Sequence, residues 1–213
     1  MNDTYAMKLN MSQLQTCQQD AAALSLSKIP PMQRRRLSAI AKLALGHALQ
    51  ALENNTVDYI IWVSQYGDEH KTLKILEDVL QGQTPSPTQF STSVHNAVSG
   101  LYSILCEDAT PSTSLAGSWK DAVVEAYAWL KTTNNKDAKV LVVYYDEPLP
   151  EIYKEQQNFD AIAMTAIFSL AQENLSLNLN IEQAEKYAAV EAKAFYDFWQ
   201  QQDVAQFNAW TKC

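Results

Sequence analysis

Apolar and polar positions along the chain form two kinds of pattern, which predict strands and helices in alternation. Short runs that are apolar throughout, or apolar at every second residue, are typical of strands. The predicted strands are residues 6–15, 57–65, 110–117, 139–148, 159–172 and 176–181, and the last two would form a hairpin. Strands that alternate with helices indicate an α/β sandwich built from βαβ units.

Longer segments place apolar residues at helical spacing. The predicted helices are residues 32–52, 71–82, 93–105, 118–131 and 181–202. Residues 93–105 are small or apolar with almost no charge, which predicts a helix buried on all sides. Ser118 is the expected N-cap of the fourth helix.

The last helix carries a broad apolar stripe, which needs a surface to bury it. The stripe consists of Ala184, Tyr187, Ala188, Val190, Ala194, Phe195 and Phe198. No linker or low-complexity tract divides the chain. The sequence therefore predicts one domain over residues 1–213, with residues 181–213 as a helical tail packed on it.

Composition and charge narrow the classes of partner. The chain is 47% hydrophobic and 19% charged, which is enough apolar material for a core. A net charge of -8 argues against a nucleic-acid-binding protein, because a basic surface supplies most of that affinity. Arg34–Arg36 is the one basic cluster. It is either a solvated helix start or a docking patch for an acidic partner such as an acyl carrier protein.

The cysteines indicate a reducing compartment, and the N-terminus and the apolar runs indicate neither export nor a membrane span. Cys17, Cys106 and Cys213 lie far apart, and neither CxxC nor HxxxH occurs, so we expect no disulfide framework and no zinc site. Glycine patterns for nucleotides are also missing, and no cofactor is expected. The N-terminus shows no signal peptide, and the longest apolar run, Ala161–Ala171, is too short to span a membrane. The sequence predicts a soluble cytoplasmic protein.

The order of segments from about residue 55 to 180 resembles the N-terminal half of the thiolase fold. "SVHNAVSGLYSI" is similar to the buried helix before the nucleophile of ketosynthases, and "STSLAGSWKDAVVEAYAWL" is similar to the nucleophile strand and its helix. "VLVVYYDEP" fits the strand that follows. More narrowly, the chain resembles short chain length factor-like proteins, which accompany ketosynthases in bacterial aryl polyene type II polyketide clusters. The resemblance implies a three-layer α/β/α thiolase-like half-fold with a mixed five-stranded sheet and a C-terminal helix.

The catalytic signature of ketosynthases does not accompany this resemblance. The slot for their nucleophilic cysteine falls within Ala116, Gly117, Ser118 and Trp119, none of which is cysteine. Ketosynthases also use two histidines from their C-terminal half, whereas no histidine follows His95 here. The resemblance therefore implies no catalytic residue. It implies a partner of a full-length ketosynthase that closes the acyl-chain tunnel, with acyl carrier protein reaching the complex.

The same resemblance points to an interface. The strand before the slot is expected at the sheet edge, so Ser112, Thr113, Ser114 and Leu115 would form a dimer contact, unless loops of this chain cover them. Val94, His95, Asn96, Val98 and Leu101 would border a pocket or the interface. We expect His95 to pack with its ring bonded to backbone or to a partner chain, and Asn96 to be a buried amide.

Two other functions stay open. One is a small acyltransferase or hydrolase that uses Ser118 or Cys106, although neither His47 nor His70 can be placed beside Ser118 from the sequence. The other is a homodimer with a binding role of its own. Asp68–His70 is interpreted as a charged turn and not as a metal site. Asp146–Glu147 end a predicted strand, where a ligand-facing edge could lie, and are interpreted as ordinary loop charges.

Overall fold

An eight-stranded mixed sheet forms the centre of the protein, with strand order β3-β2-β4-β5-β1-β6-β8-β7. The computed structural model describes residues 6–18, 26–156, 159–180 and 187–213. The strands are β1 (Ala6–Gln18), β2 (Tyr59–Ser64), β3 (Ser112–Ala116), β4 (Val140–Asp146), β5 (Ile162–Ser169), β6 (Leu175–Asn178), β7 (Gln206–Phe207) and β8 (Trp210–Lys212). The helices are α1 (Pro31–Arg34), α2 (Ala39–Ala51), α3 (Glu69–Leu80), α4 (Pro87–Ser91), α5 (Ala97–Cys106), α6 (Trp119–Thr132) and α7 (Ala188–Gln200), with a 3-10 helix at Glu151–Gln156.

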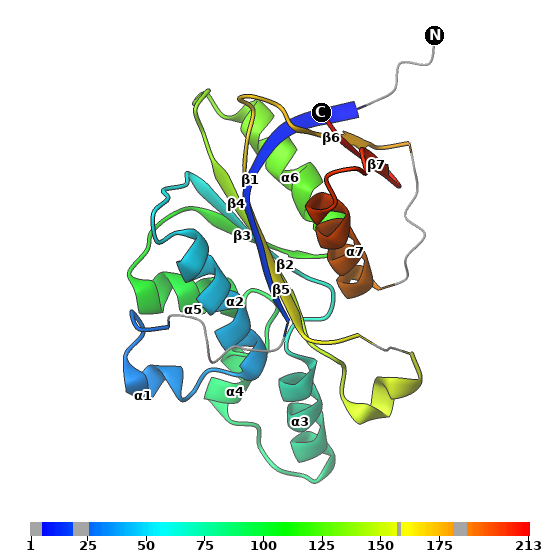
Figure 1. Cartoon of the computed structure of the whole chain (residues 1–213). Helices are drawn as coiled ribbons and strands as arrows, with labels where there is room; N and C mark the ends of the chain where they lie inside the picture. Colours follow the sequence, from blue (N-terminus) through cyan, green and yellow to red (C-terminus); the bar gives the residue numbers. More distant parts are fainter. Residues whose placement is uncertain (1–5, 19–25, 157–158, 181–186) are drawn as a thin grey trace.

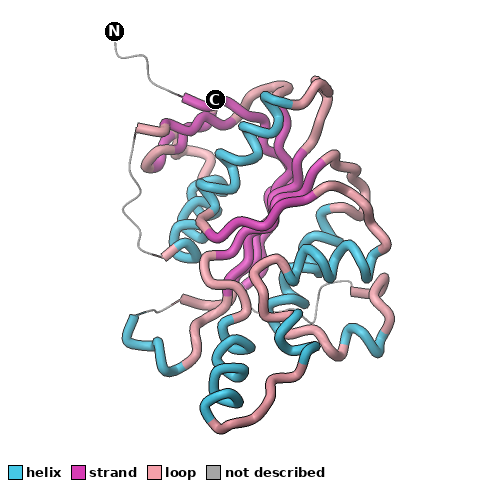
Figure 2. The backbone as a smooth tube through the Cα atoms, turned by 180° about the vertical axis from the view of Figure 1, so that it is seen from behind, coloured by secondary structure: helices cyan, strands magenta, loops and turns pink. Residues whose placement is uncertain are grey.

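Helices cover both faces of this sheet, which makes three layers (Figure 1). On β2, Ile60 and Trp62 face a core shared with α2 and α5, whereas Ile61 and Val63 face a core shared with α6 and α7. Figure 2 shows the same arrangement from behind, with the strands running between the two helical layers. The predicted three-layer α/β/α architecture is confirmed, with eight strands in place of five.

The central strands are the apolar runs of the sequence. Every residue of β4 is buried, and so are all residues of β5 except the last. Strands covered by helices on both faces have no solvent side, so polar residues do not alternate along them. β2 pairs in parallel with both β3 and β4, as connections through helices require, and β4 pairs antiparallel with β5.

The predicted hairpin between residues 159–172 and 176–181 is wrong. β1 lies between β5 and β6 and pairs antiparallel with both. The side chain of Asn174 occupies the turn between them: its Oδ1 accepts from Met11 N at 2.8 Å and its Nδ2 donates to Met11 O at 2.9 Å. The amide thereby bonds β1 as a strand residue would, and β1 separates the two segments.

Two predicted helices have different limits or surroundings. The segment 32–52 divides into α1 and α2, because Ser38 caps α2 by accepting from Ala41 N. The segment 93–105 becomes helical only at Ala97, and α5 buries just Val98 and Tyr102. The expectation of a helix buried on all sides is therefore incorrect, since Ile104 is 75% exposed.

The predicted helical tail is also shorter than expected. Residues 181–186, with Ala184 of the stripe, lie outside the described residues. α7 buries Ala188, Ala189, Glu191, Ala192, Phe195 and Phe198, so the buried stripe is rotated relative to the prediction. After α7 the chain forms the β7–β8 hairpin, and β8 pairs with β6. Residues 206–212 thus extend the sheet and are not helical.

None of the helices in the described part of the chain is long and apolar enough to cross a membrane.

Candidate functional site

The three parallel strands β2, β3 and β4 end on the same side of the sheet, and the predicted nucleophile slot follows the end of β3. This side, where the carboxyl ends of the strands lie, is called an edge here and is distinct from the outer edge formed by β3. β2 ends at Ser64, β3 at Ala116 and β4 at Asp146. Gly117 N donates to Ser64 O at 3.1 Å, which joins the slot to the end of β2. In open α/β sheets, ligand sites form at this kind of edge. This edge is therefore the candidate site.

Asp146 is the most heavily bonded side chain of this edge. It is buried, and its Oδ1 accepts from Ser64 Oγ at 2.7 Å and from Tyr66 N at 3.3 Å. Its Oδ2 accepts from Gln65 N at 3.0 Å and from the Tyr144 hydroxyl. Burial raises the pKa of Asp146, and the hydrogen bonds that it accepts oppose this effect. The interpretation of Asp146 as an ordinary loop charge is incorrect, because the carboxylate fixes the turn after β2.

His95 reaches the same turn. Its Nε2 lies 3.1 Å from Ser64 O, the carbonyl that also accepts from Gly117 N. A ring nitrogen that faces a carbonyl oxygen carries the proton, so Nε2 is the donor. The ring therefore bonds to the backbone of this chain, which is one of the two roles expected for His95; the other was a bond to a partner chain. Asn96, by contrast, is exposed, and its side chain does not cap α5, so the expectation of a buried amide is wrong.

The four residues of the slot have structural environments. Ser118 is the N-cap of α6: its Oγ accepts from Asp121 N at 3.3 Å and donates to Asp121 Oδ2 at 2.8 Å. Asp121 in turn accepts from Ser118 N at 2.8 Å, which completes a capping box. Trp119 is fully buried in the core, and Ala116 offers only a methyl group. The predicted N-cap at Ser118 is confirmed.

A side chain at Gly117 would collide with the side chain of Asp121. A Cβ atom built at this position would lie 2.8 Å from Asp121 Oδ2 and 3.2 Å from Asp121 Cβ. The carboxylate cannot move away freely, because it holds the capping box with Ser118. A cysteine at this position would thus displace the Asp121 side chain and weaken the capping box of α6.

The other candidate reactive groups lie elsewhere. Cys106 is half-buried at the end of α5, and burial, followed by the charge of Asp108, raises the pKa of its thiol. His47 is buried in α2 with Nδ1 2.9 Å from Leu43 O, and burial lowers its pKa. His70 Nε2 lies 2.9 Å from Pro148 O. Each of these histidine rings is bonded to a backbone carbonyl.

Glu147 and Asp68, which were interpreted from the sequence as ordinary loop and turn charges, flank the site. Burial, and next the charge of Asp68, raises the pKa of Glu147 to about 7. Asp68 caps α3 by accepting from Lys71 N and pairs with the Lys71 ammonium at 2.9 Å. The sequence did contain a signal for the burial of Glu147, because in "VLVVYYDE" the acidic residues directly follow an apolar strand. Among the described residues, no group of three or more His, Cys, Asp or Glu side chains is placed to hold a metal ion.

A narrow crevice opens beside His95, between α2, the start of α3 and the start of α5. It contains four of the five residues proposed for a pocket or interface: Val94, His95, Val98 and Leu101, but not Asn96. Ser38, Asp68, Lys71 and Tyr145 border it as well. It leaves room for about one water molecule, so an acyl chain would have to widen it.

β3 lies at the end of the strand order, as predicted, and Ser112–Leu115 belong to it. Its one neighbour among the described strands is β2. Thr113, Ser114 and Leu115 are half-buried, and Ser114 Oγ donates to Ser99 Oγ of α5 at 3.0 Å. The inner side chains thus contact this chain, whereas the outer side of the strand has no strand partner among the described residues.

The family of the protein follows from comparison with known sequences. Residues 9–212 match the family model of the beta-ketoacyl synthase N-terminal domain. The chain belongs to this family. No curated protein matches the sequence. The family resemblance stated from the sequence is confirmed by this match.

Solved structures are similar to this beta-ketoacyl synthase domain. One is a ketosynthase (ApeO) in complex with its chain length factor (ApeC) from Xenorhabdus doucetiae, with a TM-score of 0.78 and 21% identity. The match covers 97% of this chain and 98% of the matched chain of that complex, so the two chains are of nearly equal length. Another is the HMG synthase of the curacin biosynthetic pathway in complex with holo donor-ACP, with a TM-score of 0.43 and 12% identity over 81% of this chain and 44% of that chain. The first likeness establishes the thiolase-like half-fold.

Proposed function

We propose that this protein is a non-catalytic, chain length factor-like partner of an active ketosynthase in type II fatty acid or polyketide biosynthesis. The observation that carries the proposal is the closed nucleophile slot, where Asp121 occupies the space that a side chain at position 117 would need. A ketosynthase acts through a cysteine thiolate at a helix N-terminus. At the start of α6, this chain has a capping box in place of such a thiolate.

The open edge of β3 supports pairing with a partner. Pro111 O accepts from Ile60 N at 3.0 Å, and Gly117 N donates to Ser64 O at 3.1 Å, so odd-numbered residues direct their backbone groups toward β2. Successive residues of a strand alternate in direction, and the backbone groups of Ser112 and Ser114 therefore face outward. An unpaired edge of this kind accepts a strand from another chain.

The role in acyl-chain length is the finer part of the proposal. The crevice with Val94, Val98 and Leu101 lies beside α5, the helix that contacts β3 through Ser99. A subunit seated on β3 would enclose these apolar side chains and extend them into a tunnel. The structure of a ketosynthase with its chain length factor from Xenorhabdus doucetiae is a precedent for such a pair. We assign the aryl polyene context on the sequence resemblance, and acyl carrier protein would reach the complex through the ketosynthase.

The enzyme alternative has less support. The Ser118 hydroxyl already donates to a carboxylate and accepts from a backbone N–H. The raised pKa of the Cys106 thiol lowers its thiolate fraction. Neither group has the activated state that nucleophilic catalysis needs.

Co-expression with a ketosynthase of the same gene cluster, followed by affinity purification and native mass spectrometry, tests the proposal. We expect a one-to-one complex that Ser114→Pro abolishes, because proline removes an outward N–H without breaking the β2 ladder. The matched variant Ser114→Ala removes only the bond to Ser99 and should retain the complex. A folded chain that ignores the ketosynthase, or one that alone turns over an acyl thioester, would overturn the proposal.

A further inference from the structure

An arm of two helices stands at one end of the molecule, away from the three layers. It consists of α3, the loop after it and α4, residues 69–91, and we call it the α3–α4 arm (Figure 1). It connects β2 to α5, and both the view in Figure 1 and the reverse view in Figure 2 show it beyond the end of the sheet. A connection between parallel strands needs a single crossover helix. The arm is additional to that need.

The arm exposes its apolar side chains. α3 buries a single residue, Ile75, although apolar positions recur along it at helical spacing. Leu76 is 50% exposed, Val79 52% and Leu80 87%, and Phe90 of α4 is 61% exposed. In a monomer, the apolar stripe of a surface helix is normally packed against the core. The stripe of α3 has no such cover within the described part of the chain.

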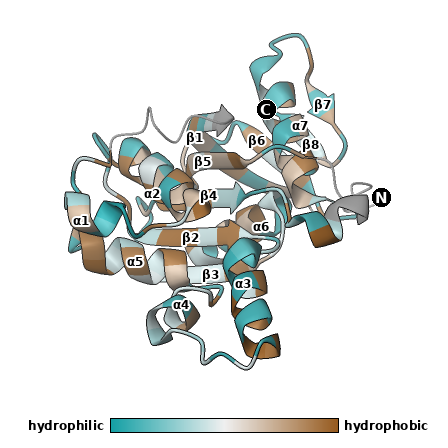
Figure 3. Ribbon diagram, turned by 90° about the horizontal axis from the view of Figure 1, so that it is seen from below, coloured by the Kyte–Doolittle hydropathy of each residue, from teal (hydrophilic) through white to brown (hydrophobic). Residues whose placement is uncertain are grey.

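Exposed apolar residues concentrate in this part of the sequence. Of the nine large apolar side chains exposed among the described residues, six lie between positions 76 and 104: Leu76, Val79, Leu80, Phe90, Val94 and Ile104. Figure 3 shows α3 and α4 on the side of the sheet where β3 lies, with brown apolar segments on α3. Leu76, Val79 and Leu80 are neighbours on the surface of α3, at spacings of three and four residues, and contiguous exposed apolar surface marks an interaction site.

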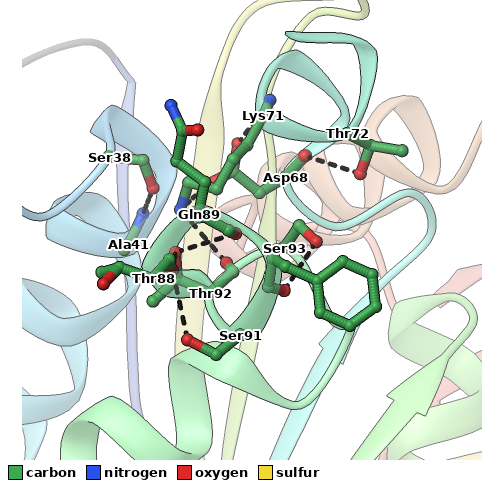
Figure 4. Close-up of polar contacts among 11 residues, drawn as sticks. Ser38, Ala41, Asp68, Lys71, Thr72, Thr88, Gln89, Ser91, Thr92 and Ser93 are labelled. Carbon is green, nitrogen blue, oxygen red and sulfur yellow. Dashed lines mark hydrogen bonds and ion pairs between the residues drawn. The ribbon is translucent and has the colours of Figure 1, made fainter. Parts of the chain in front are cut away.

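Polar contacts hold the arm in position. Lys71 pairs with Asp68 and donates to Thr92 O at 3.1 Å, which ties the start of α3 to the end of α4 (Figure 4). Thr72 Oγ1 donates to Asp68 O, and Thr92 Oγ1 donates to Thr88 O. Because the two helices are fixed to each other before any partner binds, little ordering would be needed on binding.

The area that a stable complex requires indicates what covers the arm. A specific interface buries about 800 Å² on each partner. The five residues of β3 extend over roughly 17 Å, so a strand added to this edge covers a strip far smaller than that area. The partner must therefore contact further surface beside β3. The apolar side chains of the arm offer exposed surface on the same side of the sheet as β3.

We propose that the α3–α4 arm is a docking clamp for the partner ketosynthase, which would present an apolar surface to Leu76, Val79 and Leu80. This inference rests on the proposed function. A membrane surface fits less well, because α3 carries Lys71 and Lys74 against Glu69, Glu77 and Asp78 and so has no basic face. A second copy of this chain would bring together two proteins that each carry a net charge of -8.

Binding of purified ketosynthase to the purified chain, measured by isothermal titration calorimetry, tests the clamp. The variant combines Leu76→Gln and Leu80→Gln, which replace exposed residues by one with similar helix propensity, so the fold should persist. We expect the Kd to rise at least about tenfold, since buried apolar anchors dominate interface energies. Ile152→Gln is the matched control, because Ile152 is 72% exposed but lies outside the arm and β3.

The outcomes separate the two proposals. If the ketosynthase binds the unaltered chain, and Ser114→Pro abolishes binding while the double arm variant retains the original Kd, the clamp is overturned and the proposed function stands. If the unaltered chain does not bind the ketosynthase, both fall. If the arm variant changes only self-association of the chain, measured by analytical ultracentrifugation, then the arm contacts a second copy and the clamp is again overturned.

Discussion

Ser64 and Asp146 are 82 positions apart in the chain, and the Ser64 hydroxyl donates to Asp146 Oδ1 at 2.7 Å. The bond joins the ends of the neighbouring strands β2 and β4. Ser64 Oγ also accepts from Gly67 N at 2.7 Å, and Ser64 O accepts from both His95 Nε2 and Gly117 N. The turn after β2 is thus fixed to β4, to the start of α5 and to the nucleophile slot through one serine.

Replacing Asp146 by asparagine should destabilise the fold by about 2–4 kcal/mol. Each carboxylate oxygen accepts from one backbone N–H, Oδ1 from Tyr66 and Oδ2 from Gln65. Whichever way the amide is oriented, its NH2 group meets a backbone donor. Urea unfolding gives the free energy of unfolding, with the exposed Asp203→Asn as control. An equal midpoint for both variants would show that the network contributes little.

Gly117→Ala should destabilise the protein by roughly 1–2 kcal/mol, because the added methyl group displaces Asp121 from the capping box of α6. Gly100→Ala is the matched control. Gly100 lies in α5, and a Cβ there meets no atom within 4 Å. The control should stabilise the helix by about 0.5–1 kcal/mol. Thermal unfolding would contradict the account if both variants changed the Tm in the same direction.

The Glu147 carboxyl should make stability fall as the pH rises. Its pKa is about 7 in the folded protein, against about 4.3 in an unfolded chain. Between these values the folded state binds more protons, so the free energy of unfolding decreases from pH 4.5 to 7. The charge of Asp146 also raises the pKa of Glu147, whereas the interactions with His70 and Lys71 lower it.

Glu147→Gln should remove this dependence and stabilise the protein by about 1–2 kcal/mol at pH 8, after allowance for partial solvent screening. It should have little effect at pH 5. Urea unfolding at both pH values measures the difference, with the exposed Glu53→Gln as control. A change of equal size at both pH values would contradict the assignment.

Lys212 should stabilise the end of α7. Its ammonium donates to Phe198 O at 2.9 Å and to Gln201 O, and it lies 4.6 Å from the centroid of the Phe198 ring. It thus adds a second donor to Phe198 O, which already accepts from Gln201 N, and bonds the Gln201 carbonyl just past the end of the helix. Lys212→Met, which retains an apolar stem, should cost about 1–2 kcal/mol in urea unfolding. The exposed Lys136→Met should have no such effect, and equal losses would contradict this role.

Much of the central architecture was predictable because its signals are local. Residues 57–65 and 139–148 are apolar runs, and they became strands buried on both faces. Ser118 was recognisable as a helix cap from its own sequence context. The missing cysteine in the slot was also visible in the sequence alone.

The sequence did not predict what depends on distant segments. Residues 159–172 and 176–181 are close in the chain and were expected to pair, yet β1 lies between them. The buried state of Asp146 arises from donors on β2 and the turn after it. For α5, composition indicated full burial, but the helix lies at an open edge and exposes Ile104.

The sequence by itself determined most of the central strands and helices, where α6 begins and which reactive groups the slot lacks. These features follow from the conformational preferences and hydrophobicity of neighbouring residues. Only the tertiary structure decided the order of the strands, the partners of Asp146 and Ser64, and the exposure of the α3–α4 arm. Such features depend on how much apolar surface each packing arrangement buries and on which distant polar groups it pairs, and neither quantity is set by adjacent residues.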